Sequence, residues 1–185
     1  MSQWQSGNAI ANGVRIHYHR TGGARPPLLL LHGITDNGLC WTRLVRALEP
    51  DYDCIMVDAR GHGLSEAPAS GYAPLDHAAD VAGLIGALDL VRPALIGHSM
   101  GAATAAVAAG GWPERVGAVV LEDPPWFAEP PMPADPDAAL EEWRAGMAAN
   151  KARTVEELVA LCREQSPGWD EVEWLPWAES KRQVD

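Results

Sequence analysis

The sequence predicts an α/β fold built on a doubly wound, mostly parallel sheet of about six strands. Between residues 14 and 121, short continuous apolar runs alternate with segments in which apolar residues recur at helical spacing. Runs without polar alternation are typical of strands buried on both faces, so we expect helices on both sides of a parallel sheet. The 185 residues, 47% of them apolar, suit one globular unit with a small appendage and argue against intrinsic disorder.

The predicted elements follow in chain order. Residues 14–19 alternate with period two, which is typical of a half-exposed strand, and they belong to a two-stranded antiparallel start. Continuous apolar runs predict strands at residues 27–31, 54–57, 93–96 and 116–121. Helical spacing predicts helices at residues 41–48, 78–88 and 100–109, the last of them ended by Gly110 and Gly111.

The chain changes character after residue 125. Residues 126–185 hold five of the eight tryptophans and 13 acidic against 6 basic residues, and several prolines precede the first helical pattern, among them Pro130 and Pro131. Helical spacing over residues 137–147 and a capping box at Thr154 and Glu157 predict helices only. We therefore expect a core at residues 1–125 and a partial helical lid at residues 126–185. The alternative is a helical appendage that merely packs against the core.

Composition excludes several classes of partner. A net charge of −11 argues against nucleic acid and anionic membranes, and no run reaches 18 apolar residues. The first 12 residues lack the basic and apolar regions of a signal peptide, so we expect a cytoplasmic protein. Cys40, Cys54 and Cys162 are odd in number and widely spaced, which favours reduced thiols over a disulfide framework or a zinc site. No metal or organic cofactor is implied.

The motif with chemical content is Gly97-His98-Ser99-Met100-Gly101, in which a serine stands between two glycines. Alone the G-x-S-x-G pattern is weak, but here it lies where a predicted strand meets a predicted helix, as a nucleophile elbow requires. Such a turn exposes the serine hydroxyl at a helix N-terminus, where partial positive charge favours an oxyanion. The alternative is an ordinary strand-to-helix turn in which Ser99 only caps the helix.

Two further motifs follow the two preceding apolar strands: His32-Gly33-Ile34, and the D-x-R-G-x-G-x-S pattern at residues 58–65. With these three motifs in order, residues 14–126 resemble the α/β-hydrolase family. The resemblance implies that the backbone N–H groups of Ile34 and Met100 form the oxyanion hole, and that Asp58 and Arg60 brace the site without reacting. A serine in place of an aspartate at the elbow favours acyl transfer over the epoxide-hydrolase and dehalogenase branches.

The base that should activate Ser99 is not in this chain. None of the six histidines follows Ser99 in the sequence, although family order is serine, acid, histidine. His98 should point away from the hydroxyl, and His32 is expected to be a structural hydrogen-bonding residue. His62 and His77 are expected at the surface. His17 and His19 share one face of a strand and could supply two ligands of a metal site. The favoured alternative is that both lie on a solvated face of that strand.

The family sheet has strands in the order 1-2-4-3-5-6-7-8, with the lid after strand 6. Counted this way, residues 116–121 form strand 6, and strands 7 and 8 do not follow in this sequence. Strand 6 is then expected to form an unpaired apolar edge of the sheet. We therefore expect the N-terminal part of a longer hydrolase, inactive as 185 residues alone. Asp123 is a candidate for the triad acid, and the favoured alternative is that it braces the turn into the lid.

For the complete enzyme the sequence predicts a serine hydrolase that cleaves a small or medium carboxylic ester, lactone or thioester through an acyl-enzyme on Ser99. Within the same fold, a C–C bond hydrolase and an enol-lactonase are alternatives. From other classes, a non-catalytic interaction module and an inert fragment stay open. The expected partners are a small acyl substrate and a C-terminal segment or second chain that completes the sheet, and a homo-oligomer is left open.

Overall fold

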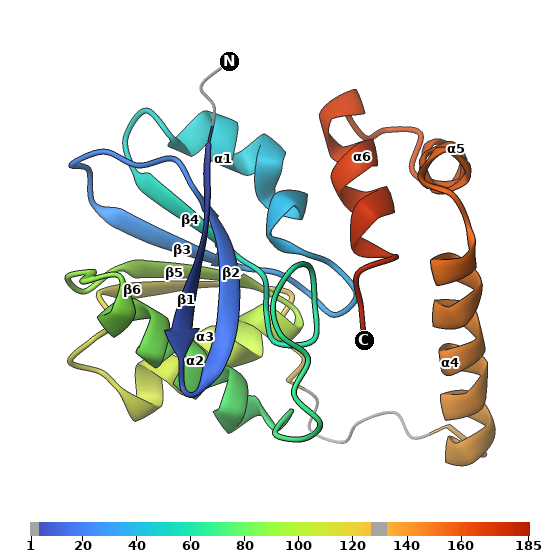
Figure 1. The fold of residues 1–185 in the computed structure, drawn as a ribbon, viewed down its shortest axis with the longest axis horizontal. Coiled ribbons are helices and arrows are strands. Elements are labelled where there is room, and N and C mark those ends of the chain that lie inside the picture. The colour runs from blue at the N-terminus through green and yellow to red at the C-terminus, as the bar shows by residue number, and fades with distance from the viewer. Residues whose placement is uncertain (1–3, 127–132) are drawn as a thin grey trace.

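The computed structural model describes residues 4–126 and 133–185, and Pro130 and Pro131 of the predicted joint lie outside them. One six-stranded sheet runs in the order β1-β2-β4-β3-β5-β6 (Figure 1). Its strands are β1 (Gln5–Ala11), β2 (Val14–Arg20), β3 (Pro27–Leu31), β4 (Asp53–Val57), β5 (Ala94–His98) and β6 (Ala118–Glu122). The pairs β1–β2 and β2–β4 are antiparallel and all others are parallel. The predicted fold class is confirmed, and so is the strand order that the resemblance implies.

The helices come close to the predicted ones, with two differences. They are η1 (Gly38–Trp41), α1 (Thr42–Leu48), α2 (Pro74–Ala87), α3 (Met100–Gly111), α4 (Pro136–Ala152), α5 (Val155–Gln165) and α6 (Glu171–Ser180). The glycines at 110 and 111 do not end α3 but form its last turn. The sequence analysis missed α6, which contains Pro176 and begins with a capping box of Asp170 and Glu173.

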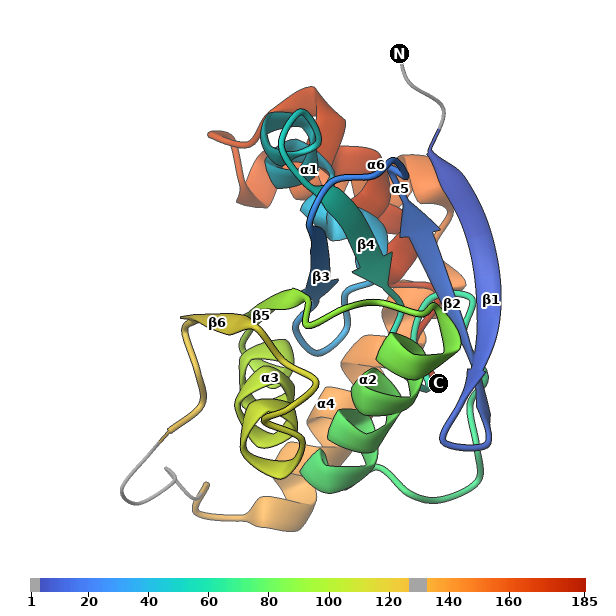
Figure 2. The same ribbon diagram turned by 90° about the vertical axis from the view of Figure 1, so that its left-hand side faces the viewer.

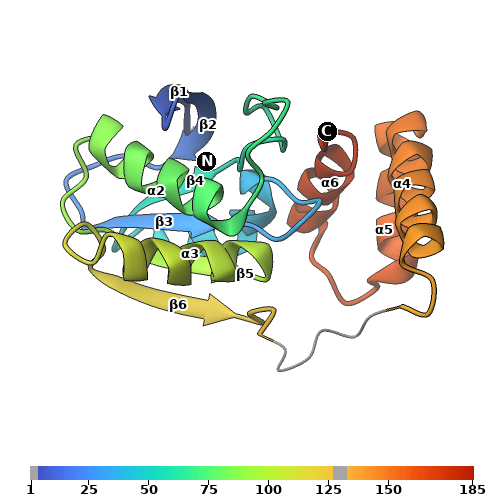
Figure 3. The same cartoon turned by 90° about the horizontal axis from the view of Figure 1, so that it is seen from below.

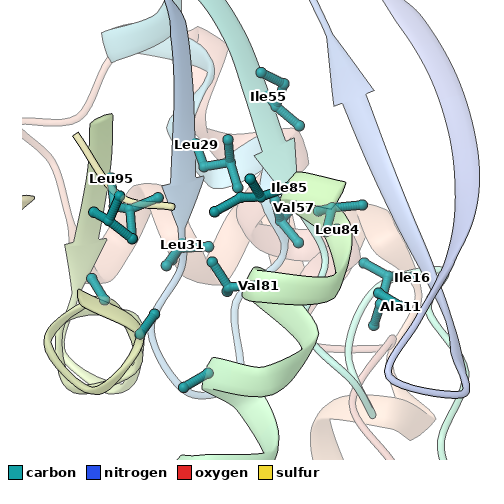
Figure 4. Packing of buried hydrophobic residues seen from close by; sticks show 14 of the residues in the cluster. Ala11, Ile16, Leu29, Leu31, Ile55, Val57, Val81, Leu84, Ile85 and Leu95 are labelled. Carbon is teal, nitrogen blue, oxygen red and sulfur yellow. The ribbon is translucent and has the colours of Figure 1, made fainter. Parts of the chain in front are cut away.

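Helices cover both faces of the sheet, as the continuous apolar strands predict. On one face, side chains of α2 such as Val81, Leu84 and Ile85 pack against β3 and β4, and α3 packs beside them (Figure 4). On the other face, Val45 of α1 packs with Leu28, Leu30, Cys54 and Met56. Alternate residues of β3 and β4 therefore enter two separate cores, so both strands must be apolar throughout.

The two edge strands differ in exposure. β1, whose bounds the sequence did not give, and β6 lie at opposite edges of the sheet (Figure 2). Among the described residues no strand pairs with the outer edge of β6, and Val120 there is 56% exposed. This agrees with the expected unpaired apolar edge.

The helices α4, α5 and α6 lie beyond the carboxyl ends of the parallel strands (Figure 3). Helix α6 contacts η1 and α1, whereas α4 carries no buried residue. The capping box at Thr154 is confirmed at the start of α5. The division into units at residue 125 stays a prediction. Within the described ranges, no helix is both long enough and apolar enough to cross a membrane.

Candidate active site

Ser99 occupies the turn between β5 and α3. Its backbone has φ 50° and ψ −112°, a positive φ that is uncommon for a non-glycine residue. Its N–H donates to the carbonyl oxygen of Glu122 at 2.9 Å, which ties the turn to the end of β6. Although Ser99 holds the N-cap position, its side chain makes no capping hydrogen bond, so the N-capping alternative is wrong. The unusual backbone conformation of Ser99 therefore does not serve to cap the helix with its side chain.

The two glycines of the motif are required by close approach of backbone. A Cβ on Gly97 would overlap the carbonyl of Gly101, and a Cβ on Gly101 would overlap the carbonyl oxygen of Leu31 in β3. The first turn of α3 is thus pressed against the centre of the sheet, where no side chain fits. This contact fixes where the N-terminus of α3 lies relative to the end of β3.

The two predicted oxyanion donors lie on these neighbouring elements. Met100 is the first residue of α3, so its N–H has no carbonyl partner within the helix. Ile34 follows the end of β3, and the Gly33 carbonyl before it accepts hydrogen bonds from His32 Nδ1 at 2.8 Å and from Asp36 N at 3.2 Å. Because a trans peptide is planar, the Ile34 N–H points opposite to that carbonyl. Their role as the oxyanion hole stays a prediction.

His32 is a buried positioning residue and not a base. Its Nδ1–H donates to Gly33 O, and its Nε2 accepts from the Ala59 N–H at 3.0 Å, so both ring nitrogens are engaged and the imidazole is neutral. Burial, with a smaller effect of neighbouring His62, lowers the pKa of His32 to about 4. The expected structural role agrees with this geometry.

Acid is expected to destabilise the fold through this histidine. Between its ordinary pKa of 6.5 and about 4, the unfolded chain binds a proton that the folded chain excludes. Stability is therefore fully present above pH ~6.5 and falls as the pH falls, by up to about 3 kcal/mol from His32. Burial also lowers the pKa values of His19, His62 and His77, in the same direction.

Urea denaturation at about pH 7.5 and about pH 4.5 measures this loss. A His32→Gln variant does not titrate at this position, so it should lose less stability over the same interval. Wild-type stability that is flat or rising toward pH 4.5 would contradict the assignment.

Three histidines lie elsewhere than expected. The sequence analysis placed His62 and His77 at the surface and His17 on a solvated strand face, but all three are buried. His62 is covered by the C-terminal residues, since Val184 forms a β-bridge with it. His77 lies on the inner face of α2, beside the ring of Tyr72. Among the described residues, no histidine hydrogen-bonds Ser99, and no group of three His, Cys, Asp or Glu side chains could hold a metal.

Hydrogen bonds of two charged residues, Asp58 and Arg60, hold the loop after β4 in place. Asp58 accepts hydrogen bonds from the backbone N–H groups of Gly38 at 2.7 Å and Leu64 at 2.9 Å. Arg60, 3% exposed, pairs with Asp80, 5% exposed, through its Nε at 2.6 Å. These bonds join the loop to η1 and to α2, so both charged residues have structural partners.

A hollow of about 230 Å³ lies between the core loops and α6. It borders the elbow on two sides, because His98 precedes Ser99 and the Glu122 carbonyl holds the Ser99 N–H. The described residues that line it supply three indole rings and three carboxylates and no lysine or arginine. The lining residues are His32, Gly33, Asp36, Cys40, Trp41, His98, Glu122, Trp169, Glu173 and Trp177.

The sequence analysis missed Lys181, which ties the helical segment to the loop after β3. Its Nζ donates to the carbonyl and hydroxyl oxygens of Thr35 at 3.0 and 3.1 Å and to Asp36 Oδ1 at 2.7 Å. Asn37 in turn donates to Gln183 Oε1 at 2.9 Å. No motif marks Lys181, because the contact spans more than 140 residues.

Asp123 follows β6 with φ 45° and is exposed. Within residues 4–126 and 133–185, its carboxylate has no hydrogen-bond partner, neither a histidine nor a backbone group of the turn. Both its role as triad acid and the alternative that it braces the turn stay predictions.

Comparison with known proteins matches this chain to a hydrolase family model and to two hydrolytic enzymes. Residues 26–166 match the family model described as alpha/beta hydrolase fold. The chain is 42% identical over 104 residues, 56% of its length, to the 2-(acetamidomethylene)succinate hydrolase of Mesorhizobium japonicum, and the match covers 37% of that protein. It is 40% identical over 120 residues, 64% of its length, to the N-formylmaleamate deformylase of Pseudomonas putida, of which the match covers 45%. Both matches thus span less than half of the relative.

A solved structure extends the similarity to nearly the whole chain. The crystal structure of the N-formylmaleamic acid deformylase from Pseudomonas putida S16 superimposes with a TM-score of 0.77 at 30% identity. The superposition covers 97% of this chain and 69% of that one. The likeness therefore includes the helical segment as well as the sheet.

Proposed function

The chain belongs to the alpha/beta hydrolase fold family, and from that premise we propose that Ser99 is the nucleophile of a hydrolase that works through an acyl-enzyme. The observation that carries the proposal is the strained elbow, where Ser99 has φ 50° and a side chain that makes no capping bond. A serine held in that way at a helix N-terminus is suited to attack a carbonyl carbon.

In the proposed mechanism, Ser99 Oγ attacks the acyl carbon and the N–H groups of Ile34 and Met100 bind the developing oxyanion. His32 serves this step from a distance, since it holds the Gly33 carbonyl and thereby the direction of the Ile34 N–H. The base that takes the serine proton is not one of the six histidines of this sequence. Without it, we expect Ser99 in the 185 residues alone to give no turnover.

The first candidate for the bond cleaved is a small or medium carboxylic ester, lactone or thioester. A second candidate is an acylated nitrogen, favoured by the relatives named for 2-(acetamidomethylene)succinate and N-formylmaleamate. Both proceed through the same acyl-enzyme, so they differ in the leaving group and not in the role of Ser99.

We place the substrate in the hollow beside the elbow, with α4–α6 as its lid. Trp41, Trp169 and Trp177 supply apolar area for an acyl or alcohol group. Among the described residues, two of its three carboxylates pair with cations, Asp36 with Lys181 and Glu173 with Arg43, so most of the negative charge of the hollow is neutralised.

Chemical rescue of the base tests the proposal on this chain. With p-nitrophenyl butyrate as acyl donor, added imidazole should raise butyrylation of Ser99 at least about tenfold, because it replaces the general base at this half-buried turn. Peptide mass spectrometry measures the modification. Ser70, an exposed serine in a loop, is the internal reference for unspecific acylation.

The controls separate the elbow from general reactivity. Ser99→Ala should remove the modified peptide and leave the modification of Ser70 as it was. If imidazole raises acylation of Ser99 and Ser70 by the same factor, Ser99 is not specially activated and the proposal fails.

A further inference from the structure

At the edge of the sheet far from the elbow, a serine lies within hydrogen-bond distance of a buried histidine. We propose that Ser6 on β1 is an acylatable nucleophile, with His17 on β2 as its general base and Asp58 as the group that orients the imidazole. Ser6 Oγ lies 2.7 Å from His17 Nε2, and His17 Nδ1 lies 2.8 Å from Asp58 Oδ2. The proposal is independent of Ser99.

The protonation states follow from the partners of Asp58. Burial alone would raise the pKa of this carboxyl, but hydrogen bonds from His17, Leu64 and Gly38 outweigh burial and lower it, so Asp58 is ionised. An ionised carboxylate only accepts, and His17 Nδ1 must therefore carry a proton. In the neutral ring Nε2 is then the acceptor, and Ser6 has to donate its hydroxyl proton to it. This is the arrangement of a serine held against a general base.

Burial keeps the base in place while the nucleophile stays accessible. His17 is 2% exposed and Asp58 is 3% exposed, whereas Ser6 is exposed on the edge strand. The ring of His19 lies edge-on against that of His17 with centroids 4.8 Å apart, which restricts rotation of the imidazole. The antiparallel register places Ser6 opposite His19 and Asn8 opposite His17, so the serine reaches His17 diagonally across one face of the sheet.

The reaction is the transfer of an acyl group from a small activated ester or thioester. The Ser6 Oγ–carbonyl carbon bond forms and the bond from that carbon to the leaving group breaks. The serine proton passes to His17 Nε2 and from there to the departing alcohol or thiol. Water can then hydrolyse the ester by the same route, with His17 as base. Exposure on the edge strand favours small donors that arrive from solvent.

Acylation rates of individual serines test the proposal. The chain with Ser99→Ala is treated with p-nitrophenyl acetate and, separately, with the acetyl thioester of N-acetylcysteamine, and acetylated peptides are quantified by mass spectrometry over time. Ser6 is expected to react about 10²-fold faster than Ser70, an exposed serine without a histidine hydrogen bond in the structure. This comparison needs no variant at the proposed site.

Two variants then identify the base. Ser6→Ala should abolish the modified peptide, and His17→Gln, which cannot take a proton, should reduce Ser6 to the rate of Ser70. Circular dichroism confirms that each variant is folded. The proposal is overturned if Ser6 is acetylated no faster than Ser70 in the chain that carries only Ser99→Ala. It is also overturned if His17→Gln is folded and leaves the acetylation rate of Ser6 unchanged. Neither result bears on Ser99, whose acylation is measured separately with imidazole.

Discussion

Gly101→Ala is expected to destabilise the fold by about 3 kcal/mol, a large part of the stability of a typical domain. The added Cβ would overlap the carbonyl oxygen of Leu31 and lie 2.8 Å from that of His32. Both atoms belong to the backbone at the end of β3, a central strand paired with β4 and β5, so neither can move without breaking ladder hydrogen bonds. Urea denaturation followed by far-UV circular dichroism measures the loss.

The matched control is a glycine in the same helix. A Cβ on Gly110 meets nothing within 4 Å, so Gly110→Ala should stabilise α3 by about 0.5–1 kcal/mol through the lower conformational entropy of the unfolded alanine chain. Opposite signs at the two positions would show that close approach, and not helix propensity, requires glycine at 101. Equal effects would refute that explanation of the G-x-S-x-G motif.

Arg60→Met is expected to cost about 3–5 kcal/mol, because it leaves the carboxylate of Asp80 buried without its charged partner. The guanidinium also donates to the carbonyl oxygens of Gly71 and Asp76, so its loss leaves backbone acceptors unpaired as well. Asp80 retains only the amide of Asn12, at 3.2 Å, among the hydrogen bonds in the structure. The free energy of unfolding in urea at neutral pH measures the effect.

Two comparisons show whether the buried charge is the cause. Arg144 pairs with Glu141 on the exposed face of α4, and Arg144→Met should change stability by less than about 0.5 kcal/mol. The double variant Arg60→Met with Asp80→Leu removes both charges and should recover part of the loss. A double variant no more stable than Arg60→Met would assign the loss to the backbone acceptors instead.

The fold and the elbow could be predicted because their determinants are local. Apolar runs of four to six residues, the glycines that let α3 approach β3, and the strand-to-helix position of Ser99 are all visible within short windows of sequence. The predicted helices were wrong where a proline or glycine lies inside a helix, because these residues usually mark the end of one. Pro176 concealed α6, although Asp170 and Glu173 mark its start. Gly110 and Gly111 were taken as the end of α3, although they form its last turn.

The histidines show what local pattern cannot decide. The alternating pattern of residues 14–19 predicts that one face of the strand is exposed to solvent. His17 is nevertheless buried, and its ring contacts Asp58, 41 residues later in the chain, and Ser6 on the neighbouring strand. His62 is buried because a segment more than 100 residues away covers it.

By itself the sequence determined the alternation of strands and helices, the position of Ser99 at a turn, and the lack of a histidine after it. The order of the strands followed from the resemblance to a known family. Only the tertiary structure decided which side chains meet: Ser6 with His17, Arg60 with Asp80, and Lys181 with the loop that carries Ile34. The physical reason is that backbone conformation follows from residues close in the chain. Burial and hydrogen-bond partners depend instead on segments that packing brings together.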